Sequence, residues 1–202
     1  MAGDGVLRDV IRFFVDCASS KGVTRTPLVK LVFLADYEIF RARQHTLTGL
    51  EYTMDKMGPH SWDIPDTASD MLAEGVTQTT ADSIFGGPEY RYRSAGKSQS
   101  GYPRIPSDCL GNLRAIWVRF GRYSAKGIVD VVHKMPFVRM FQIGESVDFR
   151  LALVSAKNET RLSRWKGLRP KGRVEHSPTE AAEFEYTVHR MKYGEEEAVP
   201  LS

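Results

Sequence analysis

The sequence has few of the features that accompany covalent chemistry or a membrane span. It contains only two cysteines, Cys17 and Cys109, and no CxxC pair. This excludes a disulfide framework and favours a reducing compartment. No run of 18 apolar residues occurs, so we predict no membrane-spanning helix. The N-terminal stretch MAGDGVLRDV has neither a basic region nor a long apolar one, so we expect no secretory signal and a cytoplasmic location.

Charge of one sign is not in excess either. The 202 residues include 28 Lys and Arg against 25 Asp and Glu, a net charge of +3, whereas a nucleic-acid-binding domain is usually markedly basic. Hydrophobic residues make up 42% and aromatic residues 10%, which is enough for a folded core. The length fits one domain with an appendage.

Motifs for catalysis and for metal binding are missing. The five histidines show no HxxxH or HExxH spacing, and the chain has no GxSxG, P-loop or GxGxxG segment. Cys109 stands near a predicted helix start, where its pKa could fall, but a cysteine outside a motif is more typical of a small core residue. We therefore predict that the protein is not an enzyme and holds no metal and no cofactor.

Two helices are predicted near the N-terminus. Residues 4–22 carry an apolar stripe at helical spacing, with Arg8, Asp9, Arg12 and Asp16 mainly on the other side. A second helix, LVKLVFLADYEIFRAR, follows a cap at Thr26-Pro27 and has almost no polar face. Such a helix is buried on most sides, so we predict that it is the central core helix. Its polar residues are expected on a narrow exposed edge, namely Lys30, Asp36, Glu38 and Arg41.

Further along, β-branched and aromatic residues alternate with helical patterns. VTQTT and EYRYRS are typical of two strands around a Gly-Gly-Pro turn, and ESVDFRLALV is typical of a third strand. LEYTMDKM fits a strand or a short helix. Helices are predicted from residue 61 to Gly75, from Ser107, and from Ser124 to about Pro136. The fold class is therefore α+β and mainly helical, a compact helical domain around the buried second helix with a small antiparallel sheet or hairpin.

We predict a boundary near residue 156. Residues 1–156 form the main domain, and residues 157–202 form a basic linker followed by a C-terminal helix and tail. Six basic residues and no acidic one lie between residues 161 and 173, interrupted by glycine and proline. This stretch could be a solvated linker, could contact phosphates, or could contact an acidic protein, and the sequence leaves all three interpretations open. Ser177-Pro178-Thr179-Glu180 is a capping box that predicts the last helix.

The stretch YTMDKMGPHSWDIP places a histidine, a serine and a tryptophan directly after Gly58-Pro59. A structural interpretation explains most of it, because Gly58-Pro59 makes a turn, Ser61 caps the next helix and Trp62 packs on the domain. A contact site is the alternative, since tryptophan and arginine dominate interface hot spots. His133, at the end of a later helix, could donate to the last free carbonyl groups.

The order of these segments resembles the Panacea domain of SocA-like antitoxins. The resemblance rests on the core helix from Leu28 to Tyr37, the Leu47-Thr48-Gly49 step and Met57-Gly58-Pro59, where Met57 replaces the usual tyrosine. It covers residues 5 to about 75, with a weaker similarity over 107–141, including His133 followed by Pro136. It implies a mainly helical domain, no cofactor and no catalytic residue, in a family of bacteria and their phages or prophages.

The resemblance implies an antitoxin that binds a cognate protein toxin, often encoded by an adjacent gene. Some members are expected instead to deliver the toxin to a protease, for which a AAA+ protease is the candidate partner. We place the partner-binding surface at the turn after residue 57 and the nearby edge of the second helix, on Tyr37, Arg41, Gly58, Pro59, His60, Ser61, Trp62 and His133. The oligomeric state stays open.

A nucleic-acid-binding regulator of its own operon is the second hypothesis. The segment SKGVTRT between the first two helices would be the turn of a helix-turn-helix. We do not favour it, because the second helix offers only Lys30 and Arg41 to a groove. An enzyme is the third hypothesis, with His60 and His133 as the residues to test.

Overall fold

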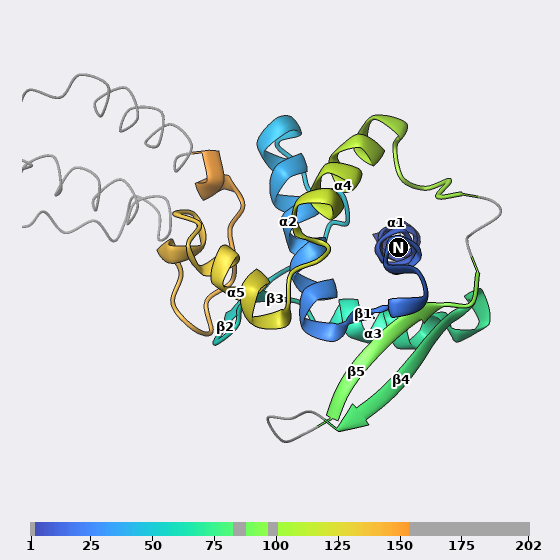
Figure 1. Cartoon of the computed structure of the whole chain (residues 1–202). Helices are drawn as coiled ribbons and strands as arrows, with labels where there is room; N and C mark the ends of the chain where they lie inside the picture. Colours follow the sequence, from blue (N-terminus) through green and yellow to red (C-terminus); the bar gives the residue numbers. More distant parts are fainter. Residues whose placement is uncertain (1–2, 83–87, 97–100, 154–202) are drawn as a thin grey trace, which may run out of the picture. The chain divides into compact units, whose positions relative to one another are not determined.

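A computed structural model describes residues 3–82, 88–96 and 101–153 of the chain (Figure 1). The chain divides into two compact units, Met1–Phe149 and Arg150–Ser202, and the first carries all the features below unless stated. Its fold is α+β and mainly helical with a small antiparallel sheet, as predicted. None of the described helices combines the length and apolarity that crossing a bilayer requires. The boundary at residue 156 stays a prediction, and the basic stretch and last helix lie outside the described residues.

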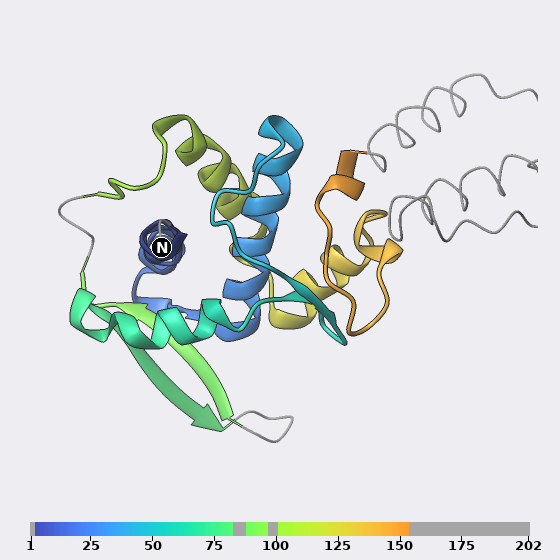
Figure 2. The same ribbon diagram turned by 180° about the vertical axis from the view of Figure 1, so that it is seen from behind.

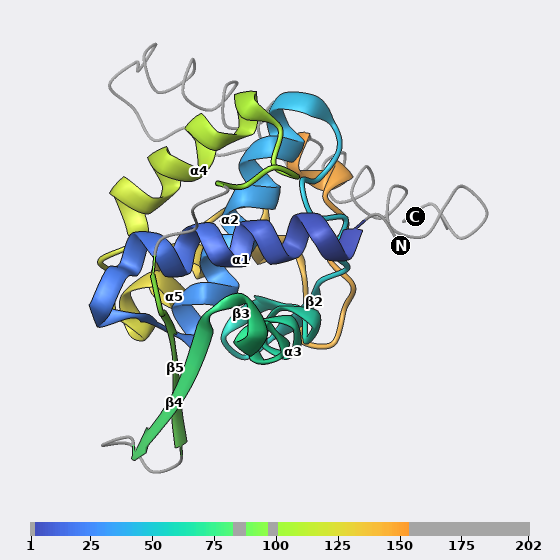
Figure 3. The same ribbon diagram turned by 90° about the vertical axis from the view of Figure 1, so that its right-hand side faces the viewer.

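Helix α2 (Arg25–Arg43) is the central core helix, as predicted. It is buried without interruption from Pro27 to Tyr37. Around it lie α1 (Gly3–Ala18), α4 (Ser107–Phe120) and α5 (Ala125–His133), all of which contact it (Figures 1 and 3). Burying one large apolar side chain is worth roughly 1.5–3 kcal/mol, so this helix carries much of the stability of the unit. The predicted cap at Thr26 is wrong, because the helix begins at Arg25 after Thr24.

The sheet contains three short strands in the order β1-β5-β4. They are β1 (Val23–Thr24), β4 (Val76–Asp82) and β5 (Pro88–Ser94), and both pairings are antiparallel. The two strands predicted around the Gly-Gly-Pro segment are therefore confirmed. Figure 2 shows α3 (Asp63–Asp70) crossing the base of this hairpin, on the side turned away from the viewer in Figure 1. As predicted, the helical segment after residue 62 ends at Gly75, whose φ is +79°.

A second hairpin pairs β2 (Thr53–Asp55) with β3 (Gly58–His60). Its turn lies at residues 56–57, so the turn predicted at Gly58-Pro59 is two residues too late. Gly58 begins β3 with a φ of +87°, and a Cβ there would lie 3.3 Å from Cγ1 of Val132 and 3.6 Å from Nε2 of His133. Glycine is required here both by the backbone angle and by the close approach of α5.

The strand predicted over ESVDFRLALV is wrong. Ser146 makes only an isolated bridge to Thr53, and residues 150–153 are helical. The segment hydrogen-bonds to β2 on both sides of this bridge, since the Met54 amide donates to the Glu145 carbonyl and the Val147 amide to the Tyr52 carbonyl, each at 2.8 Å. Phe149 then packs among core aromatic rings, so the alternating pattern does not continue as a ladder.

The polar edge predicted on α2 is wrong at two of its four positions. Lys30 is 1% exposed and Asp36 is fully buried, whereas Glu38 and Arg41 reach solvent. A buried charge is tolerated only where it is paired or hydrogen-bonded. Both residues satisfy this condition through segments that lie far from them in the sequence.

Asp36 holds the loop that follows α2. Its carboxylate accepts hydrogen bonds from the amides of Leu47 and Thr48, both at 2.9 Å, from the Thr48 hydroxyl at 2.5 Å and from the Tyr52 hydroxyl at 2.8 Å. Burial raises the pKa of Asp36, and these donated hydrogen bonds oppose that rise. Four donors converging on one carboxylate fix the Thr48-Gly49 step against the core helix.

Lys30 holds the second hairpin. Its Nζ donates to the Pro59 carbonyl at 2.7 Å. Burial lowers the pKa of Lys30 to about 8, while the charge of Asp55 acts in the opposite direction. The ammonium thus fixes the backbone of β3 at the residue directly before His60.

Replacing Asp36 with asparagine tests the first anchor. The amide keeps the shape but offers one acceptor oxygen and turns an NH2 group toward buried donors. We expect the free energy of unfolding to fall by about 3 kcal/mol, measured by urea denaturation at pH 7. Glu38→Gln, on the solvent side of the same helix, should stay within about 0.5 kcal/mol of wild type. Equal effects of the two substitutions would show that the carboxylate is not an anchor.

Replacing Lys30 with methionine tests the second anchor through pH. A lysine whose folded pKa is about 8 binds fewer protons than the unfolded chain between that value and its ordinary value of 10.5. Stability therefore rises with pH in this window, by about 1 kcal/mol per unit, relative to a variant without the amine. We expect the wild-type and Lys30→Met stabilities, measured by urea denaturation between pH 8 and 9.5, to diverge in this direction. Parallel curves would contradict a buried, titrating lysine.

Candidate functional site

Four side chains form a cluster of rings and one cation at the surface, in which Trp62 is exposed and the other three residues are half-buried. We call Arg25, His60, Trp62 and Tyr90 the Trp62 surface. Trp62 is 65% exposed, an unusual position for so large an apolar side chain. The Arg25 guanidinium lies 4.8 Å from the Trp62 ring centroid and 5.8 Å from that of Tyr90, and the His60 ring centroid lies 4.7 Å from that of Trp62.

The four residues come from four different elements. Arg25 is the first residue of α2, His60 is the last residue of β3, Trp62 directly precedes α3, and Tyr90 lies on β5. The Trp62 surface therefore exists only when both hairpins are docked on the core helix. The Lys30 hydrogen bond to Pro59 places His60, and the antiparallel pairing of β1 with β5 brings Tyr90 near the start of α2.

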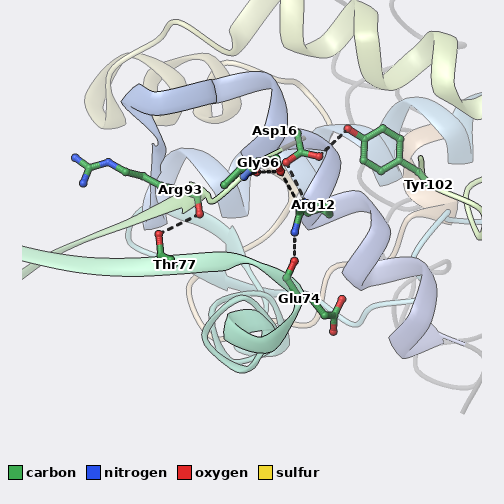
Figure 4. A network of polar contacts seen from close by, with 8 residues as sticks. Arg12, Asp16, Glu74, Thr77, Arg93, Gly96 and Tyr102 are labelled. Atoms are coloured by element: carbon green, nitrogen blue, oxygen red, sulfur yellow. Dashed lines mark hydrogen bonds and ion pairs between the residues drawn. The ribbon is translucent and has the colours of Figure 1, made fainter. Parts of the chain in front are cut away.

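The hairpin that carries Tyr90 is held at its base by α1 (Figure 4). Arg12 of α1 donates to the Asp16 carboxylate at 3.0 Å, to the Glu74 carbonyl, and to the Gly96 carbonyl at 2.6 Å. Glu74 precedes β4 and Gly96 follows β5, so one guanidinium ties both ends of the hairpin to the helix. Tyr102 completes this network by donating its hydroxyl to Asp16 at 3.1 Å.

Asp9 and Asp16, predicted on the polar side of the first helix, are not exposed to solvent. Both are buried, at 9% and 6% exposure. The polar segment before α4 covers them, because the Arg104 amide donates to Asp9 at 2.7 Å just as Tyr102 donates to Asp16. Burial and the neighbouring Asp16 carboxylate raise the pKa of the Tyr102 phenol, so the phenol remains a donor at neutral pH.

The Trp62 surface offers flat rings and one positive charge. Burial lowers the pKa of His60, and the nearby charges of Lys30 and Arg25 lower it further, which favours the neutral imidazole. A guanidinium over an indole is worth about 0.5–1 kcal/mol when exposed and about 2 kcal/mol or more once desolvated. Such a cluster gains energy when a second surface excludes water from it, and it contains no activated nucleophile.

The eight residues predicted to bind a partner fall into a buried group and a group that reaches the surface. Four of them are buried or lie in the core, namely Tyr37, Gly58, Pro59 and Ser61. The other four reach the surface, namely Arg41, His60, Trp62 and His133. The predicted cap at Ser61 is wrong, since Trp62 is the N-cap and no side chain caps α3, whereas the cap of α5 at Ser124 is confirmed. Partner binding by any of the eight stays a prediction.

The reachable residues do not form one patch. Arg41 lies 16 residues beyond Arg25 on the same helix, about 24 Å away at 1.5 Å per residue. There its guanidinium lies 5.6 Å from the Tyr37 ring centroid. His133, the last residue of α5, lies next to Gly58 at the start of β3. Only His60 and Trp62 of the predicted set share the surface described above.

Sequence reasoning missed Arg25 and Tyr90. Arg25 was read as part of a linker before a helix cap, and Tyr90 as one of two tyrosines in a strand. The two side chains meet because β5 pairs with β1, the strand directly before α2. No local pattern of residues signals such a contact, so only the arrangement of the hairpin on the core could reveal it.

Other candidate sites are weaker. A hollow of about 370 Å³ between α2 and α4 has mixed lining, from Glu38, Gly111, Asn112, Ala115, Ile116, Arg119 and Phe120. Within the described residues, no three His, Cys, Asp or Glu side chains group closely enough to hold a metal ion. Cys109 is buried, and burial raises the pKa of its thiol, the opposite of what a nucleophilic cysteine needs.

The chain matches the model of a known protein family. The family described as antitoxin SocA-like, Panacea domain, matches residues 28–136, more than half of the 202 residues. No curated protein and no solved structure matches the chain. The match begins inside α2 and ends just after α5, so it contains both anchors of the core helix, both hairpins, and three of the four residues of the Trp62 surface. The chain belongs to the SocA-like antitoxin family and carries its Panacea domain.

Proposed function

We propose that this protein neutralises a cognate protein toxin by direct binding, and that the Trp62 surface is the centre of the contact. Membership in an antitoxin family supports the role. The single observation that supports the location is the 65% exposure of Trp62 beneath a guanidinium. The proposal needs no catalysis by this chain, and it places the protein in the cytoplasm of a bacterium or of a cell that carries a prophage.

The chemistry of this surface fits a protein partner. Tryptophan, tyrosine and arginine are the residues that contribute most to binding energy in protein interfaces, especially when they lie together and lose their water on binding. The Trp62 ring is already ordered between Arg25 and His60, so less side-chain entropy is lost when a partner covers it. A standard interface buries about 800 Å² on each partner, so the contact would extend well beyond these four residues.

Two mechanisms are compatible with such a contact. In masking, the bound antitoxin covers the active surface of the toxin, and no other component is required. In delivery, the complex is recognised by a AAA+ protease and the toxin is degraded. We favour masking as the minimal mechanism. It predicts that purified antitoxin alone inhibits the toxin, whereas delivery predicts a short toxin lifetime that depends on the protease.

The alternative hypothesis, a transcriptional regulator, is less favoured because its candidate recognition helix is buried. α2 would be the helix to enter a DNA groove, yet it is buried from Pro27 to Tyr37. A reading helix must present several side chains to bases and phosphates. The burial of α2 excludes only this helix as the DNA-reading element. If another surface of the protein bound the operator, the affinity for operator DNA would fall steeply with salt concentration.

The test uses the product of the adjacent gene as the candidate toxin. Its expression alone should arrest growth, and co-expression of the full chain should relieve the arrest. We expect Trp62→Ala to weaken binding measured by calorimetry at least tenfold, and Arg25→Ala to weaken it less. Arg25→Lys should not restore full affinity, because an ammonium does not stack on the indole as a guanidinium does.

Ile143→Ala is the matched control. Ile143 is also a large apolar residue at 65% exposure, and it is not one of the four residues of the cluster, so its truncation removes comparable exposed surface without changing the cluster itself. We expect its binding and its growth rescue to equal wild type. If Trp62→Ala binds the toxin with wild-type affinity, the contact lies elsewhere on the protein. If expression of the adjacent gene alone does not arrest growth, its product is not the toxin.

A further inference from the structure

The outer edge of β4 is an unpaired strand. In the order β1-β5-β4, β5 is central and β4 has a neighbour on one side only. Within the part of the chain that the structure describes, no segment pairs with its other side. Figures 1 and 2 show β4 at the margin of a hairpin that extends away from the helices.

The register defines which backbone groups face outward. The Ala95 amide donates to the Gly75 carbonyl at 2.8 Å, and this pair continues the β4–β5 register. Hydrogen-bonded positions alternate along an antiparallel ladder, so residues 77, 79 and 81 bond to β5. Gln78 and Thr80 therefore direct their amide and carbonyl groups to the free edge. Tyr92, opposite Gln78, correspondingly pairs on its other side with Val23 of β1.

From Val76 to Ala81 this edge lacks charge, proline and bulges, three of the features that usually prevent strand pairing. Natural edge strands are protected by lysine, proline, bulges, inward charges or a covering segment. β4 has no charge and no proline from Val76 to Ala81, and its register with β5 continues over all seven residues without a bulge. Gln78, Thr79, Thr80 and Ala81 are exposed. An open, uncharged edge of this length is a template for an additional strand.

We propose that β4 pairs with β4 of a second copy of this chain. Antiparallel pairing about a two-fold axis at Thr79 places Gln78 opposite Thr80 of the partner, so the outward groups of both residues bond to each other. Asp82, the only charged residue of β4, then lies opposite Val76 of the other copy, and no like charges meet. The same patch serves both copies, as a closed dimer requires. A continuous sheet of six strands results.

A foreign strand is a less favoured occupant. From Val76 to Ala81, β4 offers such a strand no charge for selectivity, because the exposed residues there are glutamine, threonine and alanine. Self-pairing needs neither, since symmetry supplies the matching register. The argument for self-association does not rest on the proposed toxin contact, which relies on the Trp62 side chain.

The register gives the proposal a sharp test. Thr79 would face its own copy at a position without ladder hydrogen bonds, with the two Cα atoms about 4.5 Å apart. That distance lies within the range a disulfide bridges. Thr77 lies on the same face of the strand, but it would be about 14 Å from its own copy, four residues along the pairing. Mild oxidation should therefore cross-link Thr79→Cys into a dimer and leave Thr77→Cys largely uncrosslinked.

Sedimentation equilibrium of the full chain measures the association directly. We expect a concentration-dependent mass rising from 22.8 kDa toward twice that value. Thr80→Pro removes an outward amide without touching the β5 ladder, and Thr80→Lys adds charge to the edge. Each should weaken association at least tenfold. Gln142→Lys, at another exposed position, is the charge-matched control and should dimerise as wild type does.

Circular dichroism of each variant establishes that it is folded, and the wild-type chain controls for its own two cysteines. A wild-type chain that stays monomeric at 100 µM overturns the proposal. A dimer that resists both Thr80 substitutions and gives no Thr79→Cys cross-link overturns it as well, because that dimer uses another face. A monomer that loses toxin binding with Thr80→Pro but keeps it with Thr80→Lys would assign the edge to a foreign strand.

Discussion

The structure depends on two ionisable side chains that are buried inside its most apolar helix. A carboxylate or an ammonium in a core destabilises the fold unless protein donors or acceptors replace its water. Asp36 obtains four donors from residues 47–52, and Lys30 obtains the Pro59 carbonyl. Each bond joins the core helix to a segment with little regular structure of its own. Specific polar bonds thus fix a loop and a hairpin that apolar contacts alone would leave free to slide.

These anchors explain why the family resemblance lies where it does. The Leu28–Tyr37 segment, the Leu47-Thr48-Gly49 step and the residues at Gly58-Pro59 are separate in the sequence, but Asp36 and Lys30 connect them in space. The matched segments therefore describe a scaffold. The residues that we propose for partner recognition, Arg25, Trp62 and Tyr90, lie around that scaffold. Their side chains can vary without loss of the anchors, which is how one fold can serve different partners.

The sequence predicts the elements far better than their polar contacts. Periodicity identifies α2, α4, α5 and the β4–β5 hairpin, because apolar spacing is a local property, and the cap at Ser124 also identifies the start of α5. Burial of Lys30, Asp36, Asp9 and Asp16 was missed, because a charged residue within a helical pattern is normally solvated and its partners lie elsewhere. Two of the four residues of the Trp62 surface could be predicted from the sequence, because only these two are close together in it. His60 and Trp62 stand out in one short stretch, whereas Arg25 and Tyr90 join them only through strand pairing.

The two proposed surfaces are neighbours, and this has a consequence for assembly. Thr80 lies directly across the ladder from Tyr90, so the edge of β4 is one strand, about 5 Å, from a residue of the Trp62 surface. A toxin that covers about 800 Å² around Trp62 would extend farther than one strand spacing. Self-pairing and toxin binding would then compete for the same hairpin, and a free antitoxin dimer would separate as toxin accumulates. Under such competition only the monomeric fraction of the chain can bind toxin, so the apparent affinity for toxin falls as the dimeric fraction grows. In the absence of toxin, the dimer keeps the exposed edge of β4 covered.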